Sequence, residues 1–142
     1  MSIEQVNSLK IIHVDEAGIP NEEHIAIKVL EHCELSEYCL IIGLAGLDGR
    51  ATPVKDHMLW FGYGAVAPDD WIIVYTASGT TRITPTSPPG SRVIAIHWGK
   101  EHTIFQNRSL VPMIIRIGAV GMEEPPEPQY QGVTKEEPRR LF

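Results

Sequence analysis

Cysteine is scarce in this chain of 142 residues. Cys33 and Cys39 are the only two, and their spacing fits neither a CxxC redox motif nor a four-ligand zinc site. We expect each thiol to be a strand residue that is buried, and two unpaired thiols favour a reducing, cytoplasmic compartment. A chain of this length can bury enough surface to fold without disulfides or metals. We therefore expect one domain held by a hydrophobic core, with no cofactor.

Long hydrophobic runs are also missing. No stretch approaches the roughly 18 apolar residues that span a membrane, and the opening segment MSIEQVNSLK lacks the basic and apolar regions of a secretory signal. The net charge is −6, yet between residues 25 and 121 eight acidic side chains balance eight basic ones. Since no basic stripe is available to neutralise phosphates, we expect neither a nucleic-acid partner nor a membrane partner.

Helical periodicity is absent too, and short runs of β-branched and aromatic residues between Gly, Pro, Asp and Asn take its place. Such runs are typical of strands separated by turns. Strands are expected at 8–14, 24–30, 38–44, 57–63, 71–76, 92–98 and 112–117, with loops at 45–55, 82–91 and 99–111. This pattern predicts an all-β fold, an antiparallel sandwich or barrel.

Alternation along these runs predicts the core, because successive residues of a strand point to opposite faces. The residues expected to be largely buried are Ile25, Ile27, Leu40, Ile42, Trp71, Ile73, Tyr75, Ile94, Ile96 and Ile115.

From Met122 onward the composition changes to Glu, Pro and Gln (MEEPPEPQYQGVTKEEPRRLF). This segment is too polar to form a core, so we divide the chain into a sandwich domain, 1–121, and an extended C-terminal tail, 122–142. Ordering about twenty residues costs on the order of 20 kcal/mol of conformational freedom, which only extensive contacts with a partner can offset. The sizeable apolar side chains of the tail are the expected binding anchors: Tyr130, Val133, Leu141 and Phe142.

A family resemblance covers residues 38–117. It is carried by YCLII at 38–42, WF at 60–61, APDDWIIVYTASG at 67–79, IHW at 96–98, TIFQN at 103–107 and a last strand at 113–117. This order resembles the lamin-tail domain, an immunoglobulin-like β-sandwich of nuclear lamins and many bacterial proteins, here in a stand-alone bacterial or phage form. The resemblance implies that fold and a binding or structural role. The chain departs from the family where it has Gly62 in place of a common Pro.

Catalytic motifs are missing as well. The chain has neither the G-x-S-x-G elbow of a serine hydrolase nor a phosphate-binding loop, and the neighbouring carboxylates of Asp69 and Asp70 are expected to diverge. We expect no catalytic residue. One enzymatic alternative stays open, in which His57, His97 and His102 converge on a metal ion. We expect no bound metal, since His97 lies on an alternating strand and His102 in a charged loop.

Aromatic side chains give the best indication of a binding surface. Phe61 and Tyr63 are two residues apart and are expected to share one face of a strand, with Trp60 on the other. One of these faces is expected to meet solvent or a partner.

We therefore interpret the chain as a non-catalytic structural or protein-interaction module. It would self-assemble into a homo-oligomer or dock another protein, with the tail as an arm. The alternative is a β-sandwich that binds a small molecule, a glycan or a nucleotide with loops 45–55 and 80–91 at one end.

Overall fold

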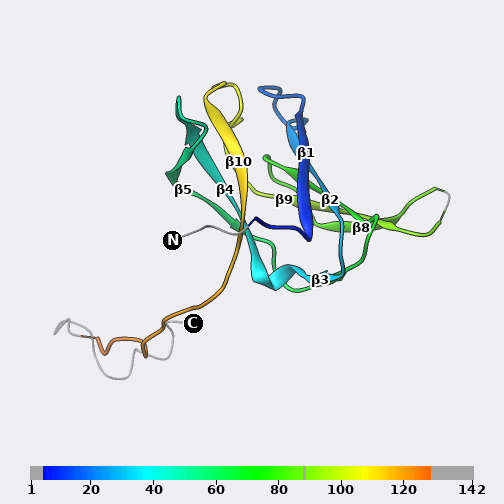
Figure 1. Ribbon diagram of the computed structural model, residues 1–142. Coiled ribbons are helices and arrows are strands. Elements are labelled where there is room, and N and C mark those ends of the chain that lie inside the picture. The colour runs from blue at the N-terminus through cyan, green and yellow to red at the C-terminus, as the bar shows by residue number, and fades with distance from the viewer. Residues whose placement is uncertain (1–4, 88, 129–142) are drawn as a thin grey trace.

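The computed structural model describes residues 5–87 and 89–128, and Figure 1 shows that they form an all-β body from which an extended segment leaves. Two sheets pack together around one core. The larger sheet has five strands in the order β1 (Leu9–Asp15), β2 (His24–Val29), β7 (Trp71–Tyr75), β9 (Arg92–His97) and β8 (Arg82–Pro85). The smaller has three, in the order β10 (Leu110–Arg116), β4 (Tyr38–Ala45) and β5 (Ala51–Trp60).

A two-stranded ribbon of β3 (Cys33–Glu34) and β6 (Ala65–Val66) and the 3-10 turn η1 (Leu35–Glu37) complete the described elements. Strand pairing is antiparallel except between β7 and β9. After β7 the chain first forms the outer strand β8. It then returns as β9, which lies between β7 and β8, and β9 therefore runs parallel to β7.

Two of the expected loops contain strands. Residues 82–85 form β8, and β5 begins at Ala51, inside the segment expected as a loop. The proline that argued against a strand there, Pro53, is tolerated because β5 is an edge strand. The register between β4 and β5 shifts between Ile41 and Gly43, which lets Asp56 adopt a positive φ of 62°. The last strand likewise begins earlier than expected, at Leu110.

The core lies between the inner faces of the two sheets. Of the residues expected there, Ile25, Ile27, Leu40, Ile42, Ile94 and Ile96 are buried, as period-two alternation predicted. They form one cluster with Leu9, Val29, Leu35, Tyr38, Phe61, Val66, Ile72, Val74, Ile104 and Phe105.

The expectation for β7 was wrong. Ile72 and Val74 are fully buried, whereas Trp71, Ile73 and Tyr75 point outward and are half-buried. Every residue of this strand is apolar or aromatic, so alternation gives the period but not the side that faces the core. Ile115 was also assigned to the wrong side, because it lies on the outer face of the three-stranded sheet and is exposed.

One buried carboxylate ties the loops of the body together. Glu23 is 1% exposed, and its oxygens accept hydrogen bonds from Gly18 N (2.8 Å), Thr76 Oγ1 (2.9 Å), Ile104 N (2.7 Å) and Phe105 N (2.9 Å). Four donors satisfy a charge that would otherwise be costly to bury. This network fixes the segment between β9 and β10 against the start of β2.

Candidate functional site: an apolar outer sheet face

The outer face of the three-stranded sheet is apolar at every paired position of three cross-strand rows, of which the second and third are separated on β5 by the bulge at residues 54–57. The register places Ile115, Cys39 and Trp60 in the first row, Met113, Ile41 and Met58 in the second, and Val111, Gly43 and Pro53 in the third. An antiparallel sheet with one solvated face normally alternates apolar and polar residues. Here both faces of the sheet are apolar, although none of the described elements forms a layer over the outer one. We call these nine residues the apolar face.

The centre of the apolar face is buried, whereas residues at its margins are exposed. Cys39 and Ile41 are buried, while Met58, Trp60 and Ile115 beside them are 63%, 43% and 42% exposed. Met113 lies across Gly43, where an added Cβ would overlap the end of the methionine side chain. The central strand β4 is therefore bordered by methionine side chains, which are long and flexible and can adapt to a partner surface.

An aromatic pair stands at one end of the apolar face. Trp60 and Tyr63 make an edge-to-face contact with ring centroids 5.0 Å apart, and Tyr63 is 86% exposed. The contact forms because the strand ends at Trp60 and the chain turns at Gly62, whose φ is +84°. The indole Nε1 of Trp60 donates a 2.8 Å hydrogen bond to the carbonyl of Ser36, which fixes the ring.

The carboxylate of Glu34 holds the turn that carries this pair. Glu34 Oε2 accepts hydrogen bonds from Gly64 N (2.7 Å) and Ser36 N (3.2 Å), and the first of these contributes most to lowering the pKa of the carboxyl group. Leu35 N donates to Gly64 O at 2.8 Å and closes the turn from the other side. The Trp60 ring is thus set in place before any partner arrives, which reduces the entropy lost on binding.

Sequence reasoning had named Trp60, Phe61 and Tyr63, but it grouped them wrongly. Phe61 points into the core and is buried, so it belongs to the fold and not to the surface. Trp60 and Tyr63 come together instead, because the strand stops before the alternation could separate them. The four expected tail anchors, Tyr130, Val133, Leu141 and Phe142, lie outside the described residues.

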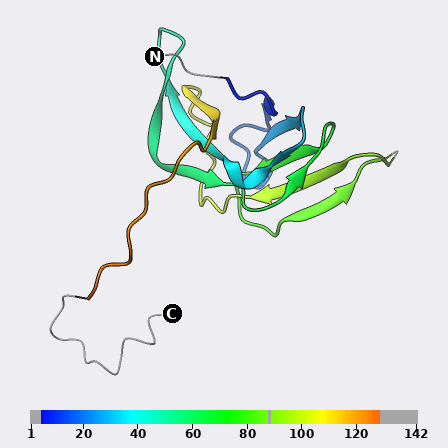
Figure 2. The same ribbon diagram turned by 60° about the horizontal axis from the view of Figure 1, so that its bottom comes forward.

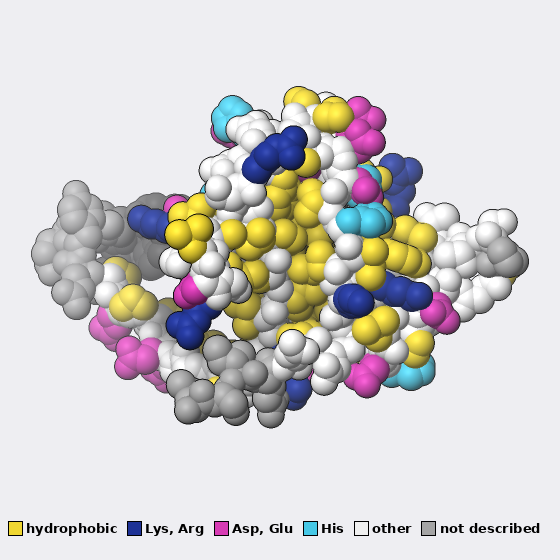
Figure 3. Space-filling view, turned by 45° about the horizontal axis from the view of Figure 1, so that its top comes forward, with side chains coloured by type: hydrophobic (Ala, Val, Ile, Leu, Met, Phe, Trp, Pro, Cys, Tyr) yellow, Lys and Arg dark blue, Asp and Glu magenta, His cyan; other side chains and the backbone are white. Residues whose placement is uncertain are grey.

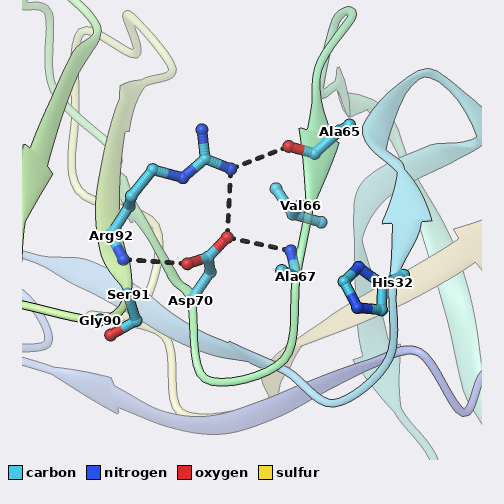
Figure 4. Close-up of a pocket in the computed structure, with 8 residues that line it drawn as sticks. All are labelled: His32, Ala65, Val66, Ala67, Asp70, Gly90, Ser91 and Arg92. Atoms are coloured by element: carbon cyan, nitrogen blue, oxygen red, sulfur yellow. Dashed lines mark hydrogen bonds and ion pairs between the residues drawn. The ribbon is translucent and has the colours of Figure 1, made fainter.

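The pocket drawn in Figure 4 is lined by an ion pair between Asp70 and Arg92, which we call the Asp70–Arg92 clamp. Asp70 is buried, and it accepts hydrogen bonds from Ala67 N (3.0 Å), Arg92 N (2.9 Å) and Arg92 Nη2 (3.1 Å), while the same Nη2 reaches Ala65 O (2.8 Å). Burial, the largest influence, raises the pKa of Asp70, but these hydrogen bonds and the Arg92 charge together lower it. The cavity of about 340 Å³ is bordered by charges that already neutralise each other.

The three histidines of the metal hypothesis are not brought together. Among the described residues no group of three or more His, Cys, Asp or Glu side chains is placed to hold a metal ion. His97 instead ends a cross-strand row that continues through Tyr75 and His24 to Asp15. The His97 ring stacks on the Tyr75 ring with their centroids 5.1 Å apart. At the other end of the row, His24 Nε2 lies 3.1 Å from Asp15 Oδ2.

The loops proposed for small-molecule binding do not meet. The turn between β4 and β5 and the turn between β8 and β9 project from opposite sides of the body (Figures 1 and 2). A polar cleft of about 510 Å³ lies elsewhere, between residues 18–21, 76–78 and 100–106. Its walls include Lys100, Glu101 and His102, and sequence reasoning had not singled it out as a cleft.

Both thiols have a raised pKa. Burial raises the pKa of Cys39, and burial together with the charges of Glu37, Glu31 and Glu34 raises that of Cys33. Both cysteines are unpaired. A raised pKa favours the protonated thiol at neutral pH.

Comparison with known proteins gives no match: no protein-family model, curated protein or solved structure is significantly similar to the chain. Nor do the described residues include a helix of the length and apolar character needed to cross a membrane. The geometry of the apolar face therefore carries the functional argument.

Proposed function

We propose that this protein is a non-catalytic protein-interaction module, and that the apolar face with the Trp60–Tyr63 pair is its docking surface. The observation that carries the proposal is the apolar character of all nine paired positions on a sheet face over which the described residues place no second layer. The polar residues Lys55, Asp56 and His57 lie in the bulge of the edge strand, between the second and third rows. Trp and Tyr are enriched among residues that dominate binding energy, particularly where they are held rigidly.

The exposed area agrees with a docking role. If each large side chain presents about 200 Å² when free, the exposed parts of Met58, Trp60, Tyr63 and Ile115 amount to roughly 450 Å². A contiguous apolar patch of a few hundred Å² on a single chain is commonly functional. A homo-oligomer or a complex with another protein would remove this patch from water.

The immunoglobulin-like, lamin-tail-like architecture belongs to the same proposal. Two packed sheets and the order of the motifs at 38–42, 67–79 and 96–98 favour it, and domains of that kind serve as binding modules. The unpaired, protonated thiols favour a cytoplasmic setting.

Site-specific photo-crosslinking tests the docking surface. The full chain is expressed with p-benzoylphenylalanine in place of Tyr63 and, as a matched control, in place of Ile83, which is 60% exposed on β8. We expect covalent protein adducts from position 63 and far fewer from position 83. Met58→Lys should remove the adducts from position 63, because an ammonium would have to be buried at the interface. Equal adduct yields from both positions would contradict the proposal.

A second candidate function concerns the polar cleft. The polar cleft beside Lys100 and His102 could admit a small polar ligand, as the small-molecule alternative requires. A ligand screen that shifted the melting temperature of the wild type, but not of a Lys100→Ala variant, would favour that role.

A further inference from the structure

The two main sheets of the described body end in four edge strands, β1, β8, β5 and β10. An exposed edge is open to pairing with another chain, and proteins blunt it with bulges, prolines, charges or short length. The pairing of β1 and of β5 is interrupted by a register shift, and β8 has only four residues, of which Arg82 is the first and Pro85 the last. β10 pairs with β4 over seven consecutive residues without a shift, and its stretch 111–115 (VPMII) carries no charge. Of the four edges, β10 is therefore the one best able to accept a further strand.

The hydrogen bonds of β10 show which backbone groups face its free side. Ile117 N donates to Glu37 O at 2.7 Å, in the same register as the paired residues before it. Opposed residues of an antiparallel pair alternate between bonded and non-bonded positions, so residues 110, 112, 114 and 116 turn their backbone groups away from β4. Pro112, which has no N–H to leave unpaired, occupies one of these positions. In the described part of the chain, no backbone group pairs with the N–H and C=O of Ile114 and Arg116.

A groove of about 910 Å³ lies beside this free edge. One wall is the segment 5–8, which leads into β1, and the other is the end of β10 with Gly118. The core is only partly covered here, because side chains from both edges pack against it without being fully buried: Val6, Ile11 and Val14 on the side of β1, and Leu110 and Ile114 on β10. Figure 3 shows hydrophobic side chains in a band through the middle of one face of the molecule. A strand added to β10 would remove apolar side chains of the groove from water.

The segment that follows β10 has the composition of a strand but no partner among the described residues. Residues 117–122 (IGAVGM) carry no charge, and residues 118–128 are exposed and lead away from the body (Figures 1 and 2). Val120 and Met122 are 73% and 88% exposed. They are two residues apart, so a strand would place both on one side, with the small residues 119 and 121 on the other. Such a segment can enter a narrow groove with its large apolar side chains inward.

We propose that residues 118–122 of a second copy of this chain add to the free edge of β10 as an antiparallel strand, and that two copies exchange these strands about a two-fold axis. Val120 of one copy lies opposite Ile114 of the other, Gly118 lies opposite Arg116, and the two Ile117 residues meet on the axis. The contact uses the edge of the sheet and not the apolar face, so the inference goes beyond the proposed function and does not rest on it.

The path of the segment favours a second copy over the same chain. To pair with its own edge, the chain would have to reverse directly after Ile117, whose N–H is bonded to Glu37 in line with β10, whereas the following residues lead away in both views. A second copy that approaches in the antiparallel direction needs no reversal. Because the segment begins where the free edge ends, each copy completes the edge of the other, as a two-fold contact requires.

Alternation supports the register. If residues 118–122 continue as a strand, residues 118, 120 and 122 turn their backbone groups and side chains to the same sides as residues 114 and 116. Val120 and Met122 then point into the groove, toward the partly covered core. A shift by two residues would either set the two Arg116 side chains against each other, which is unfavourable, or replace Ile114 by Arg116 opposite Val120. The ion pair of Arg116 with Glu37, at 3.8 Å, is kept, because only backbone groups of Arg116 take part.

Cysteine crosslinking on the axis tests the proposed register. In the full chain with Cys33→Ser and Cys39→Ala, Ile117→Cys places two thiols on directly opposed, non-hydrogen-bonded residues, whose Cα atoms are about 4.5 Å apart and within the range of a disulfide. Ala119→Cys is the matched control, because its two copies are offset by four residues, about 13 Å along the strands. Under mild oxidation we expect a covalent dimer from position 117 and little from position 119. No dimer from position 117, or equal yields from both positions, would overturn the inference.

Proline substitution tests the hydrogen bonds of the added strand. Val120→Pro removes the N–H that donates to Ile114 O of the other copy, whereas Ala119→Pro removes an N–H that faces away from it. In sedimentation equilibrium of the full chain, Val120→Pro should weaken the dimer at least about tenfold, which corresponds to roughly 1.4 kcal/mol, and Ala119→Pro should leave it within about threefold. Neither should alter the melting temperature of the monomer, since both residues lie beyond β10. Equal dissociation constants for the two variants would contradict the proposed pairing.

Failure of this inference can be told apart from failure of the proposed function. A full chain that stays monomeric at high concentration overturns the exchanged strand, while adducts from position 63 with another protein still support the docking surface. A dimer that withstands Val120→Pro but dissociates in Met58→Lys is joined through the apolar face, so that strand exchange fails and docking stands. A covalent dimer from position 117 without any adduct from position 63 gives the opposite result.

Discussion

Gly79 lies directly against the imidazole ring of His97. A Cβ added to Gly79 would overlap three ring atoms, among them Nδ1, which is buried without a hydrogen-bond partner in the described part of the chain. The ring has little room to move, because its other face stacks on Tyr75 with an interplanar angle of 13°. The segment after β7 therefore crosses over the end of β9 only because residue 79 has no side chain.

Gly79→Ala should accordingly destabilise the fold by about 1–3 kcal/mol, the usual cost of overpacking. The matched control is Gly118→Ala, because a Cβ at that position meets no atom within 4 Å. Chemical denaturation of both variants measures the difference. Equal unfolding free energies for the two variants would show that His97 can move aside.

The buried carboxylate of Glu23 should be essential for stability. Glu23→Gln replaces one acceptor oxygen by an amide donor that faces backbone N–H groups, so we expect a loss of about 2–4 kcal/mol from hydrogen bonds to a charged group. Glu22→Gln removes the same charge from a neighbouring exposed position and should cost less than about 0.5 kcal/mol. Urea unfolding at neutral pH compares them, and similar midpoints would contradict this role for Glu23.

Protonation of Asp70 at acid pH should remove the stability that the Asp70–Arg92 clamp contributes to the fold. Because the pKa of Asp70 is lowered in the folded state, its contribution is present above the unfolded pKa of about 3.9 and is lost as the pH falls through the lower folded pKa. Asp70→Asn should therefore be less stable than the wild type at pH 7, by about 2–3 kcal/mol, with a difference that narrows in acid. Asp69→Asn is the exposed control, and a constant difference across the pH range would exclude this linkage.

The two faces of β7 should respond differently to truncation. Ile72→Ala opens a cavity in the core and should cost about 2–5 kcal/mol, whereas Ile73→Ala on the outer face should cost less than about 1.5 kcal/mol. Thermal and chemical unfolding of the two variants measure the contrast. A larger loss for Ile73→Ala would mean that the strand faces the other way.

Alternation predicted the inward residues of β2, β4 and β9, but it could not orient β7. Trp71 and Tyr75 are the largest side chains of that strand, yet they remain outside because neighbouring strands cover them. The ammonium of Lys28 lies 5.9 Å from the Trp71 ring, and Tyr75 packs between His24 and His97. Such cover depends on the order of strands in the sheet, and local sequence does not contain it.

The candidate site was partly visible in the sequence. The segments YCLIIG and LVPMII are apolar at odd and even positions alike, which indicates a sheet that is apolar on both faces. The Trp60–Tyr63 contact was not predictable, because it depends on the strand ending at Trp60 and on the positive φ of Gly62. The clamp at Asp70 was missed for a similar reason, since its partner lies 22 residues away.

Glu23 also determines how the body can open. Its donors at Ile104 and Phe105 lie 81 and 82 residues away in sequence, so the loop between β9 and β10 cannot detach alone without leaving a desolvated charge behind. Local opening of that loop should be almost as costly as global unfolding. The amides of Ile104 and Phe105 should then exchange with solvent deuterium as slowly as those of the central strands, although they belong to a loop.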